Sequence, residues 1–507
     1  MLIWSVLLLL FALIILWRYV FEIIKLRRKL SSFPGPKLDN FLLGNYNLFS
    51  TKGTNIPFHI QFPMTLLSLA STYREHGLCR IWVAVDPYVL IFSAETIEPI
   101  LNSHTLITKD DTYKLLHCWL GTGLVTSTGN KWKIRRKMIT PTFHYRILDQ
   151  FLPTFDKNAK IFVKNLEEYE SEDWIDILPL VTLCTLDIIC ETAMGVEIKS
   201  QDKQCMDYIE ALQEFSNIHL ERSMTPWLFN DFIFNLTSNG AKLKRTLSVL
   251  HGLTRKILKQ RKEELKTSVD NLTDSSIGEK KKEPLLDTLI KHQFQNKDFT
   301  DQDICEEVDT FVFAGHDTTS MGICWALYHL GLHQDIQEKV YEELQGIFGD
   351  DKDKTLTADD IRKMKYLECV LKESQRISPS VPLIGRSCTE DFKIKNYTIP
   401  RGTSFMLFTY ALHRDPKVFP NPEVFDPDRF LPENCIGRHP YSFIPFSAGS
   451  RNCIGQKYAM MKLKTIVSRV IMNYKVESID PPEDILCSFL LVLRPEGQLK
   501  LRLKRRK

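Results

Sequence analysis

Apolar residues recur at helical spacing along much of the chain. Two stripes of this kind are Leu243, Leu247, Leu250, Leu253 and Ile257, and Ile361, Met364, Leu367, Val370 and Leu371. Residues one helical turn apart share a face, so both stripes predict amphipathic helices. Thr357 followed by Asp360 is typical of a helix start. Extended runs are fewer and fall at 80–93 and 392–408. The pattern predicts a mainly α fold with a small β part.

The first residues are apolar without interruption. The run covers 2–17 and is prolonged to residue 24, close to the roughly 20 residues that span a bilayer. A cleaved signal peptide is disfavoured, because no Lys or Arg precedes the run and no small-residue cleavage site follows it. The positive charges at 25–29 come after it, which favours a cytosolic location for the rest of the chain. We expect a transmembrane signal-anchor over 1–24.

Beyond the anchor, residues 25–50 form a basic and proline-rich linker. Two prolines, Pro34 and Pro36, flank Gly35 there and cannot continue a helix. The polar stretch 266–284 predicts a surface loop. With no repeat and no other break in composition, we expect one catalytic domain over 51–507.

Composition excludes several classes of function. Of 507 residues, 44% are hydrophobic and 25% charged, as in ordinary globular proteins. The net charge of +4 argues against a nucleic-acid partner. The twelve cysteines contain no C-x-x-C pair, which favours neither a disulfide framework nor a zinc site.

One cysteine, Cys453, lies in the run FSAGSRNCIG at 446–455. A lone cysteine can be a nucleophile, a metal ligand or a packing residue. Gly449 and Gly455 allow close backbone approaches, and the helical pattern after Cys453 places its sulfur near a helix N-terminus, which favours a thiolate. A thiolate is an axial ligand of haem iron in some enzymes. The pattern F-x-x-G-x-R-x-C-x-G favours that role.

The sequence resembles the cytochrome P-450 superfamily of haem-thiolate monooxygenases over nearly its whole length. The haem-binding loop of that family corresponds to Phe446, Gly449, Arg451, Cys453 and Gly455, with Cys453 as the axial iron ligand. Four more family motifs occur in the expected order: Trp132-x-x-x-Arg136, residues 314–319 (AGHDTT), Glu373-x-x-Arg376 and Pro427-x-Arg429-Phe430.

The resemblance implies roles for these residues. The propionates of haem b would be neutralised by Arg136, Arg386 and Arg451, with the indole N–H of Trp132 as a neutral donor. A buried network that holds the cysteine loop is implied for Glu373, Arg376 and Arg429.

The motif at 314–319 is implied to lie against the cofactor. Small Ala314 lets the helix approach a flat ring, and Thr318 can bond backward to a carbonyl and bend the helix. Asp317 and Thr318 are expected to be catalytic and to deliver protons during oxygen activation.

The activity implied is insertion of one oxygen atom from O2 into an apolar substrate. Electrons would come from NADPH through cytochrome P-450 reductase, with cytochrome b5 as a further candidate partner. The anchor and the lack of a mitochondrial-type presequence favour the endoplasmic reticulum membrane, with the catalytic domain in the cytosol.

A finer resemblance is to the family 4 fatty-acid ω-hydroxylases. Many of these carry a glutamate, esterified to the haem, where this chain has Ala314, so we expect a non-covalent haem here. Fatty-acid or lipid hydroxylation is the first expectation. The alternatives are hormone-like or foreign apolar substrates, a reductase-independent isomerase, and a haem carrier.

Two segments allow two interpretations each. Residues 224–234 (MTPWLFNDFIF) are either core or a membrane-touching cover of the substrate entrance. The basic residues around Trp132 are either a reductase-docking surface or a solvated helix face: Lys131, Lys133, Arg135 and Lys137.

Overall fold

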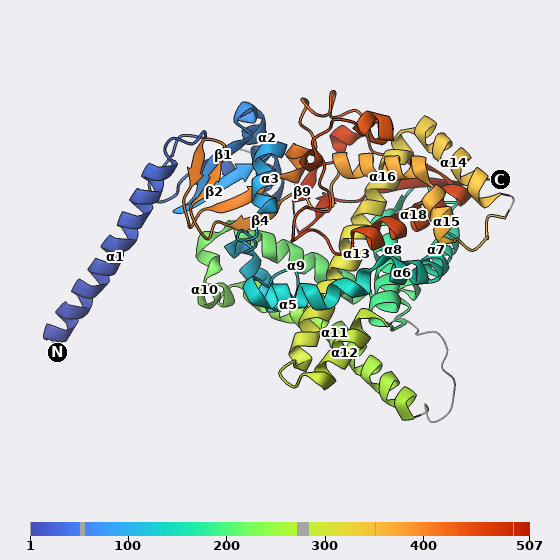
Figure 1. The fold of residues 1–507 in the computed structure, drawn as a ribbon, viewed down its shortest axis with the longest axis horizontal. Helices are drawn as coiled ribbons and strands as arrows, with labels where there is room; N and C mark the ends of the chain where they lie inside the picture. Colours follow the sequence, from blue (N-terminus) through green and yellow to red (C-terminus); the bar gives the residue numbers. More distant parts are fainter. Residues whose placement is uncertain (1, 51–55, 271–282, 350, 490, 507) are drawn as a thin grey trace.

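The structure is a computed structural model that describes residues 2–50, 56–270, 283–349, 351–489 and 491–506. Helices make up most of it, and α1 projects from a body in which a small sheet lies at one end and the helices fill the rest (Figure 1). The longer helices are α1 (Leu2–Leu30), α2 (Phe58–Thr72), α3 (Ala94–Asn102), α5 (Gly129–Ile139), α7 (Leu152–Leu166), α8 (Ile177–Ile189), α9 (Met206–Met224), α11 (Ser238–Asp270), α12 (Leu285–Gln295), α13 (Asp301–Leu332), α14 (Gln334–Phe348), α16 (Lys365–Ile377) and α18 (Gln456–Asn473). The shorter ones are α4 (His117–Leu120), α6 (Tyr145–Leu148), α10 (Asp231–Asn235), α15 (Ala358–Lys363) and α17 (Thr409–Leu412).

The strands form four small sheets. The largest has the order β1-β2-β7-β4, in which β1 and β2 are antiparallel and β2 pairs in parallel with β7; the others are β10-β9, β3-β11-β8 and β5-β6. The strands are β1 (Leu78–Val83), β2 (Asp86–Ile91), β3 (Ile175–Asp176), β4 (Ile384–Ser387), β5 (Phe392–Ile394), β6 (Tyr397–Ile399), β7 (Ser404–Leu407), β8 (Tyr474–Ser478), β9 (Cys487–Phe489), β10 (Leu493–Pro495) and β11 (Lys500–Arg505). Strands β1, β2, β5, β6 and β7 lie in the two regions predicted as extended, whereas the other six strands of the described chain were not predicted. A small β part is confirmed.

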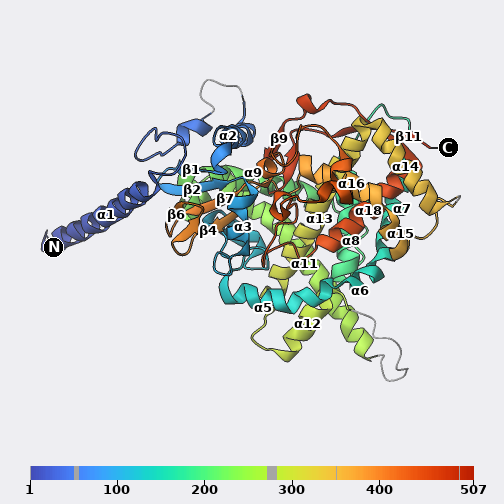
Figure 2. The same ribbon diagram turned by 45° about the horizontal axis from the view of Figure 1, so that its top comes forward.

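Helix α1 ends at Leu30, before Pro34, and its outer part lies clear of the body in both views (Figures 1 and 2). Residues 7–30 have a mean hydropathy of 2.3, with only 6% of the most apolar window buried, so α1 is long and apolar enough to cross a membrane. Its base packs on the body through Leu30, which is fully buried. Residues 177–194 pass the same test, but that segment is 78% buried and belongs to the core.

Helix α13 runs through the middle of the helical part and organises the site (Figure 2). Its start has a capping box: the Thr300 hydroxyl accepts from the N–H of Asp303, and the Asp303 carboxylate accepts from the N–H of Thr300. Helices α8, α16 and α18 pack against it. A helix covered on several sides needs residues that can be buried all round, and most of the run from Val308 to Ala326 is apolar or small.

Two predictions about helix boundaries need correction. The stripe from Ile361 to Leu371 is divided between α15 and α16, because Met364 leaves the helical conformation. The capping box at Thr357 and Asp360 is confirmed and begins α15. The prediction of a loop at 266–284 is wrong for its first residues, because α11 continues to Asp270. The i→i−4 hydrogen bonds of the helix outweigh the polar composition there. Residues 271–282 lie outside the described part of the chain.

Candidate active site

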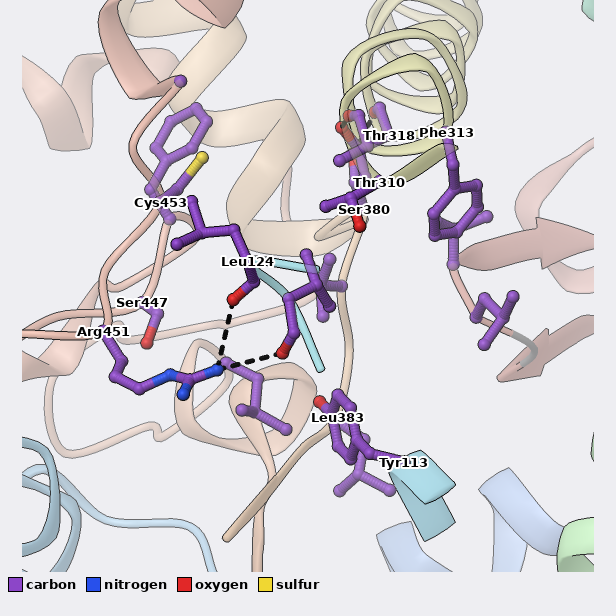
Figure 3. A pocket seen from close by; sticks show the side chains of 18 of the residues that line it. Tyr113, Leu124, Thr310, Phe313, Thr318, Ser380, Leu383, Ser447, Arg451 and Cys453 are labelled. Atoms are coloured by element: carbon purple, nitrogen blue, oxygen red, sulfur yellow. Dashed lines mark hydrogen bonds between the residues drawn. The ribbon is translucent and has the colours of Figure 1, made fainter. Parts of the chain in front are cut away.

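A cavity of about 420 Å³ lies between the loop that carries Cys453 and the middle of α13. Figure 3 shows Cys453 on one side, and Thr310 and Thr318 on α13 on the other. Most of the lining is apolar, with contributions from Phe62, Leu116, Leu220, Phe313, Val381 and Phe489. A cavity of this size and character is suited to an apolar small molecule.

The loop holds Cys453 just before α18. The N–H of Cys453 donates to the carbonyl of Phe446 at 2.8 Å, which closes the loop. Gly449 has φ +69°, and a Cβ there would come within 1.8 Å of the carbonyl oxygen of Leu101. A side chain at 449 would therefore displace the loop. Helix α18 begins at Gln456, as the sequence pattern predicted.

The sulfur of Cys453 has accessible surface, and that surface faces the cavity rather than bulk solvent. Burial within the protein raises the pKa of the thiol, whereas a hydrogen bond from the backbone of Gly455 and the charge of Arg136 lower it. A thiol placed in this way needs a partner with positive charge to become a stable thiolate. Iron in a porphyrin supplies such a charge.

Cations gather at the same end of the cavity. Arg136 on α5, Arg386 on β4 and Arg451 beside the cysteine all line it, and Arg451 lies over the ring of Trp132 at 4.8 Å. Arg451 donates to the carbonyls of Ser127 and Val125. It also makes a longer bond to the carbonyl of Leu124, which Figure 3 shows. The structure thus brings together the four side chains that the sequence analysis assigned to the propionates.

A fourth cation, Lys109, was missed. It lines the cavity, and burial together with the charges of Arg386 and Arg451 lowers the pKa of its ammonium group well below the ordinary value. The pKa of Arg451 is lowered to about 9, first by burial and then by Arg386. Lys109 lies in a polar run, residues 108–112, with no motif to mark it.

This charge cluster fits a dianionic cofactor. Among the described residues, no carboxylate forms an ion pair with Arg136, Arg386 or Arg451, although buried cations are normally paired. Asp110 is close, with a carboxyl pKa that burial raises to about 6, but its single charge cannot balance three arginines. The two propionates of a haem would supply the missing negative charge, and the sulfur of Cys453 would supply the axial ligand.

On the opposite wall, backbone carbonyls of α13 accept hydrogen bonds from side chains. The hydroxyl of Thr318 donates to the carbonyl of Ala314 at 2.8 Å, the backward bond expected from the sequence. Ser380 donates to the carbonyl of Thr318 at 2.8 Å, and Lys462 of α18 donates to the carbonyl of Gly315 at 2.6 Å. Side-chain donors therefore bind three carbonyls in two consecutive turns beside the cavity, which fixes this part of α13.

Asp317 lies on a different face of α13. It is fully buried, does not line the cavity and pairs with Arg494 on β10. One of its carboxylate oxygens has no hydrogen-bond partner among the described groups. Thr318 thus faces the cavity, whereas Asp317 reaches it only if its side chain turns from Arg494.

The paired residues predicted on α16 form a buried network. Both side chains of Glu373 and Arg376 are fully buried and make two hydrogen bonds of 2.7 and 2.8 Å. The Nε of Arg429 lies 3.5 Å from the carboxylate of Glu373, and Arg429 donates to the carbonyl of Asn421. The structure thus brings the three residues together.

The network reaches the cysteine loop through His413, which the sequence analysis missed. Arg376 donates to the carbonyl of His413, and the ring Nε2 of His413 accepts from the N–H of Ile444, nine residues before the cysteine. Burial lowers the pKa of His413 to about 3, so the ring is neutral and able to accept. A lone histidine far from Cys453 in sequence gave no signal of this link.

The basic residues around Trp132 do not share one environment. Lys131 pairs with Glu306, and buried Arg135 pairs with Asp303, so both bind α13. Lys133 and Lys137 are exposed, and within the described residues neither has an ion pair. Only these two remain candidates for docking a partner.

The aromatic segment at 224–234 also contains both buried and exposed side chains. Leu228 and Phe234 are buried, but Trp227, Phe232 and Ile233 are exposed, as is Leu236 just beyond. The core interpretation is wrong for the exposed residues. They form an apolar surface next to α9, which lines the cavity.

Comparison with known proteins gives one consistent result. The cytochrome P450 family model matches residues 53–502. Cytochrome P450 4c3 of Drosophila melanogaster is 44% identical over 436 residues, which cover 84% of this chain and 82% of that protein. Human cytochrome P450 4V2 is 43% identical over 88% of this chain and 86% of its own length. Cytochrome P450 4d2 of Drosophila melanogaster is 37% identical over 98% of this chain and 97% of its own length.

Proposed function

The chain belongs to the cytochrome P450 family and is a haem-dependent monooxygenase, and we propose that it hydroxylates fatty acids or related lipids with electrons from NADPH through a reductase. One observation carries the proposal: a largely apolar cavity separates the sulfur of Cys453 from Ala314 and Thr318 of α13. A long apolar chain fills such a space by losing its contact with water. Relatives with family 4 names support the same class of substrate.

We assign roles to the residues of the cavity as follows. Cys453 would ligate the iron, and Arg136, Arg386 and Arg451 would bind the propionates together with Trp132 and Lys109. Phe446, Gly449 and Gly455 shape the loop, and Glu373, Arg376 and Arg429 keep it in register. The cofactor, when bound, supplies oxygen activation. Binding of the substrate and delivery of protons are assigned to the side chains of the protein.

Proton delivery is assigned to Thr318 and Asp317. The Thr318 hydroxyl is a proton-carrying group at the cavity wall next to Ala314, and its bond to the Ala314 carbonyl orients it. Asp317 is one residue away, with one carboxylate oxygen unpartnered, and rotation of its side chain would carry a proton from the Arg494 side to the cavity side. Apolar neighbours exclude bulk water from this path.

Membrane and redox partners are proposed from the surface. Helix α1 is proposed to anchor the chain in the endoplasmic reticulum membrane with the catalytic part in the cytosol, and Trp227 and Phe232 would touch the same membrane. Lys133 and Lys137 are proposed to meet an acidic surface of cytochrome P450 reductase, with cytochrome b5 as a second donor. Reversing both charges to Glu should raise the KM for reductase and flatten its salt dependence.

The direct test is a reconstituted reaction. The membrane-bound protein, purified reductase and NADPH are incubated with isotopically labelled O2 and a panel of fatty acids, lipids and hormone-like compounds. We expect NADPH-dependent hydroxylation of a lipid that carries one labelled oxygen atom. Hydroxylation confined to the hormone-like or foreign compounds would contradict the lipid proposal, and rearrangement of a peroxide without NADPH would favour the isomerase alternative.

A further inference from the structure

Polar groups line the cavity at two separate ends. The cations belong to the end near Cys453, since the charges of Arg386 and Arg451 act on Lys109, and Arg136 acts on Cys453. On the α9 side, the lining residues are His219, Leu220 and Ser223. Within the described lining, this side carries no lysine or arginine.

His219 is the polar group on that side whose hydrogen bonding is incomplete. Its Nδ1 is buried and has no hydrogen-bond partner among the described groups. The ring lies parallel to Phe215, with centroids 6.1 Å apart, so packing fixes its plane. A buried polar atom without a partner is costly unless something else, such as a ligand, completes its hydrogen bonding.

The nearby arginine is held by contacts outside the cavity. Arg222 is one turn from His219, but its guanidinium pairs with Asp231 and donates to the carbonyls of Leu228 and Phe229. It also lies over the ring of Phe234 at 4.2 Å. These contacts occupy Arg222 outside the cavity.

His219 itself is neutral near pH 7. Burial, and then the charge of Arg222, lowers its pKa to about 4. A neutral imidazole has one donor and one acceptor nitrogen and therefore suits a hydroxyl, carbonyl or amide. An unpaired carboxylate is far more costly to bury than any of these groups.

Thr310 on α13 offers a second site of the same kind. Its hydroxyl is buried without a partner in the described structure and lines the cavity four residues before Ala314. Trp119 links the two walls, since its ring contacts both Phe215 and Phe313. His219 and Thr310 are thus uncharged hydrogen-bonding groups set in an aromatic and apolar surround.

We propose that His219, supported by Thr310, recognises the hydrogen-bonding group of an uncharged lipid, so that the cavity selects a fatty alcohol or ester over the corresponding fatty-acid anion. This inference deepens the proposed lipid hydroxylation and rests on it. His219 is then a specificity-determining residue, and the substrate class is a neutral long-chain lipid.

The test is a spectral titration of the holoprotein with four ligands of one chain length: 1-hexadecanol, methyl palmitate, palmitate and hexadecane. We expect the alcohol and the ester to bind at least tenfold more tightly than palmitate and hexadecane. His219→Phe keeps the packing on Phe215 and should remove most of that preference, with hexadecane affinity unchanged. His219→Gln keeps a donor and an acceptor and should restore part of it. Ser223→Ala is the matched control, because Ser223 already donates to the carbonyl of Leu220.

The outcomes separate this inference from the proposed function. If palmitate binds most tightly, or His219→Phe weakens all four ligands equally, the inference is overturned while lipid binding stands. If a well-folded holoprotein binds none of the four, both the inference and the lipid proposal fail. If His219→Phe does not fold, His219→Leu takes its place: an alcohol preference equal to that of the wild type in this variant would overturn the inference, and loss of the preference with a normal hexadecane affinity would support it.

Discussion

Lys462 on α18 donates to the carbonyl oxygen of Gly315 on α13 at 2.6 Å, although the lysine is fully buried and pairs with no carboxylate in the described structure. Gly315 lines the cavity, and a Cβ there would come within 2.4 Å of Ile189 on α8. Helix α13 is therefore held between a close packing contact on one side and a buried donor on another. The position of its cavity-facing turn depends on residues outside the cavity.

Burial of Lys462 predicts that the free energy of unfolding rises with pH above about pH 7. Burial lowers the pKa of Lys462 to about 7, whereas an exposed lysine titrates near pH 10.4. Between these values the unfolded chain binds a proton that the folded protein does not, so stability rises with pH by about 1.4 kcal/mol per unit. Below pH 7 both states are protonated and this contribution is constant.

Lys462→Met and Lys462→Gln should both lose that pH dependence. Denaturation midpoints of each holoprotein at pH 7, 8 and 9 give the difference from the wild type. Only Lys462→Gln keeps a donor for Gly315, so it should stay closer to the wild-type haem content. Parallel curves for the wild type and both variants would show that Lys462 is not the group responsible.

The buried pair on α16 predicts a large loss on truncation. Arg376→Ala removes both short hydrogen bonds from the fully buried carboxylate of Glu373 and leaves it, among the described residues, only the more distant Arg429 as a charged partner, at 3.5 Å. Breaking a buried pair of this kind costs roughly 3–5 kcal/mol. We expect little haem-containing protein from this variant, measured as the ratio of haem to polypeptide.

Helix α15 supplies a matched control for it. Arg362 and Asp359 have the same i,i+3 spacing, but their side chains are 63% and 75% exposed. Pairs of that kind contribute about 0–1 kcal/mol. Arg362→Ala should retain normal haem content. Equal haem contents in the two variants would refute a structural role for the buried pair.

Removing the hydroxyl of Thr318 should separate electron use from product formation. In Thr318→Ala, NADPH oxidation continues but a proton-carrying group at the cavity wall is lost, so we expect hydroxylated product per NADPH to fall about tenfold, in the range of general acid–base effects. Thr319→Ala is the matched control, because it removes a neighbouring hydroxyl that makes the same backward bond, here to the carbonyl of Gly315, and to which no proton-transfer role is assigned. A normal product ratio in Thr318→Ala would exclude the assigned role.

Because residue 314 is alanine, we expect a non-covalently bound haem that can be extracted from the polypeptide. An alanine side chain has no carboxyl group to form an ester, so acidic organic solvent should extract the haem completely. Ala314→Glu introduces a carboxyl at the cavity wall and should retain a fraction of the haem after turnover, whereas Ala314→Gln should retain none. Haem that stays with the wild-type polypeptide after extraction would be incompatible with non-covalent binding.

The features that could be predicted from the sequence are those that depend on residues close together along the chain. The Cys453 loop, the capping box at Thr357 and the Glu373–Arg376 pair each depend on residues a few positions apart. Their spacing alone predicted the loop before α18, the start of α15 and the shared helix face.

Tertiary contacts account for what the sequence did not show. Lys109 joins Arg386 at the cavity, His413 meets Ile444, and Lys462 meets Gly315, all across long stretches of chain. No periodicity links such residues, and each looks like an ordinary polar residue in its own segment. The aromatic run at 224–234 was ambiguous for a related reason, since exposure depends on what packs over it.

The ligand at position 453 is the central claim, and one spectrum tests it most directly. Carbon monoxide is added to dithionite-reduced membranes that contain the wild type or Cys453→Ser, and the difference spectrum is recorded. The wild type should show the red-shifted Soret band that is diagnostic of thiolate-ligated ferrous haem, and Cys453→Ser should lack it. An identical band in both proteins would contradict ligation by Cys453.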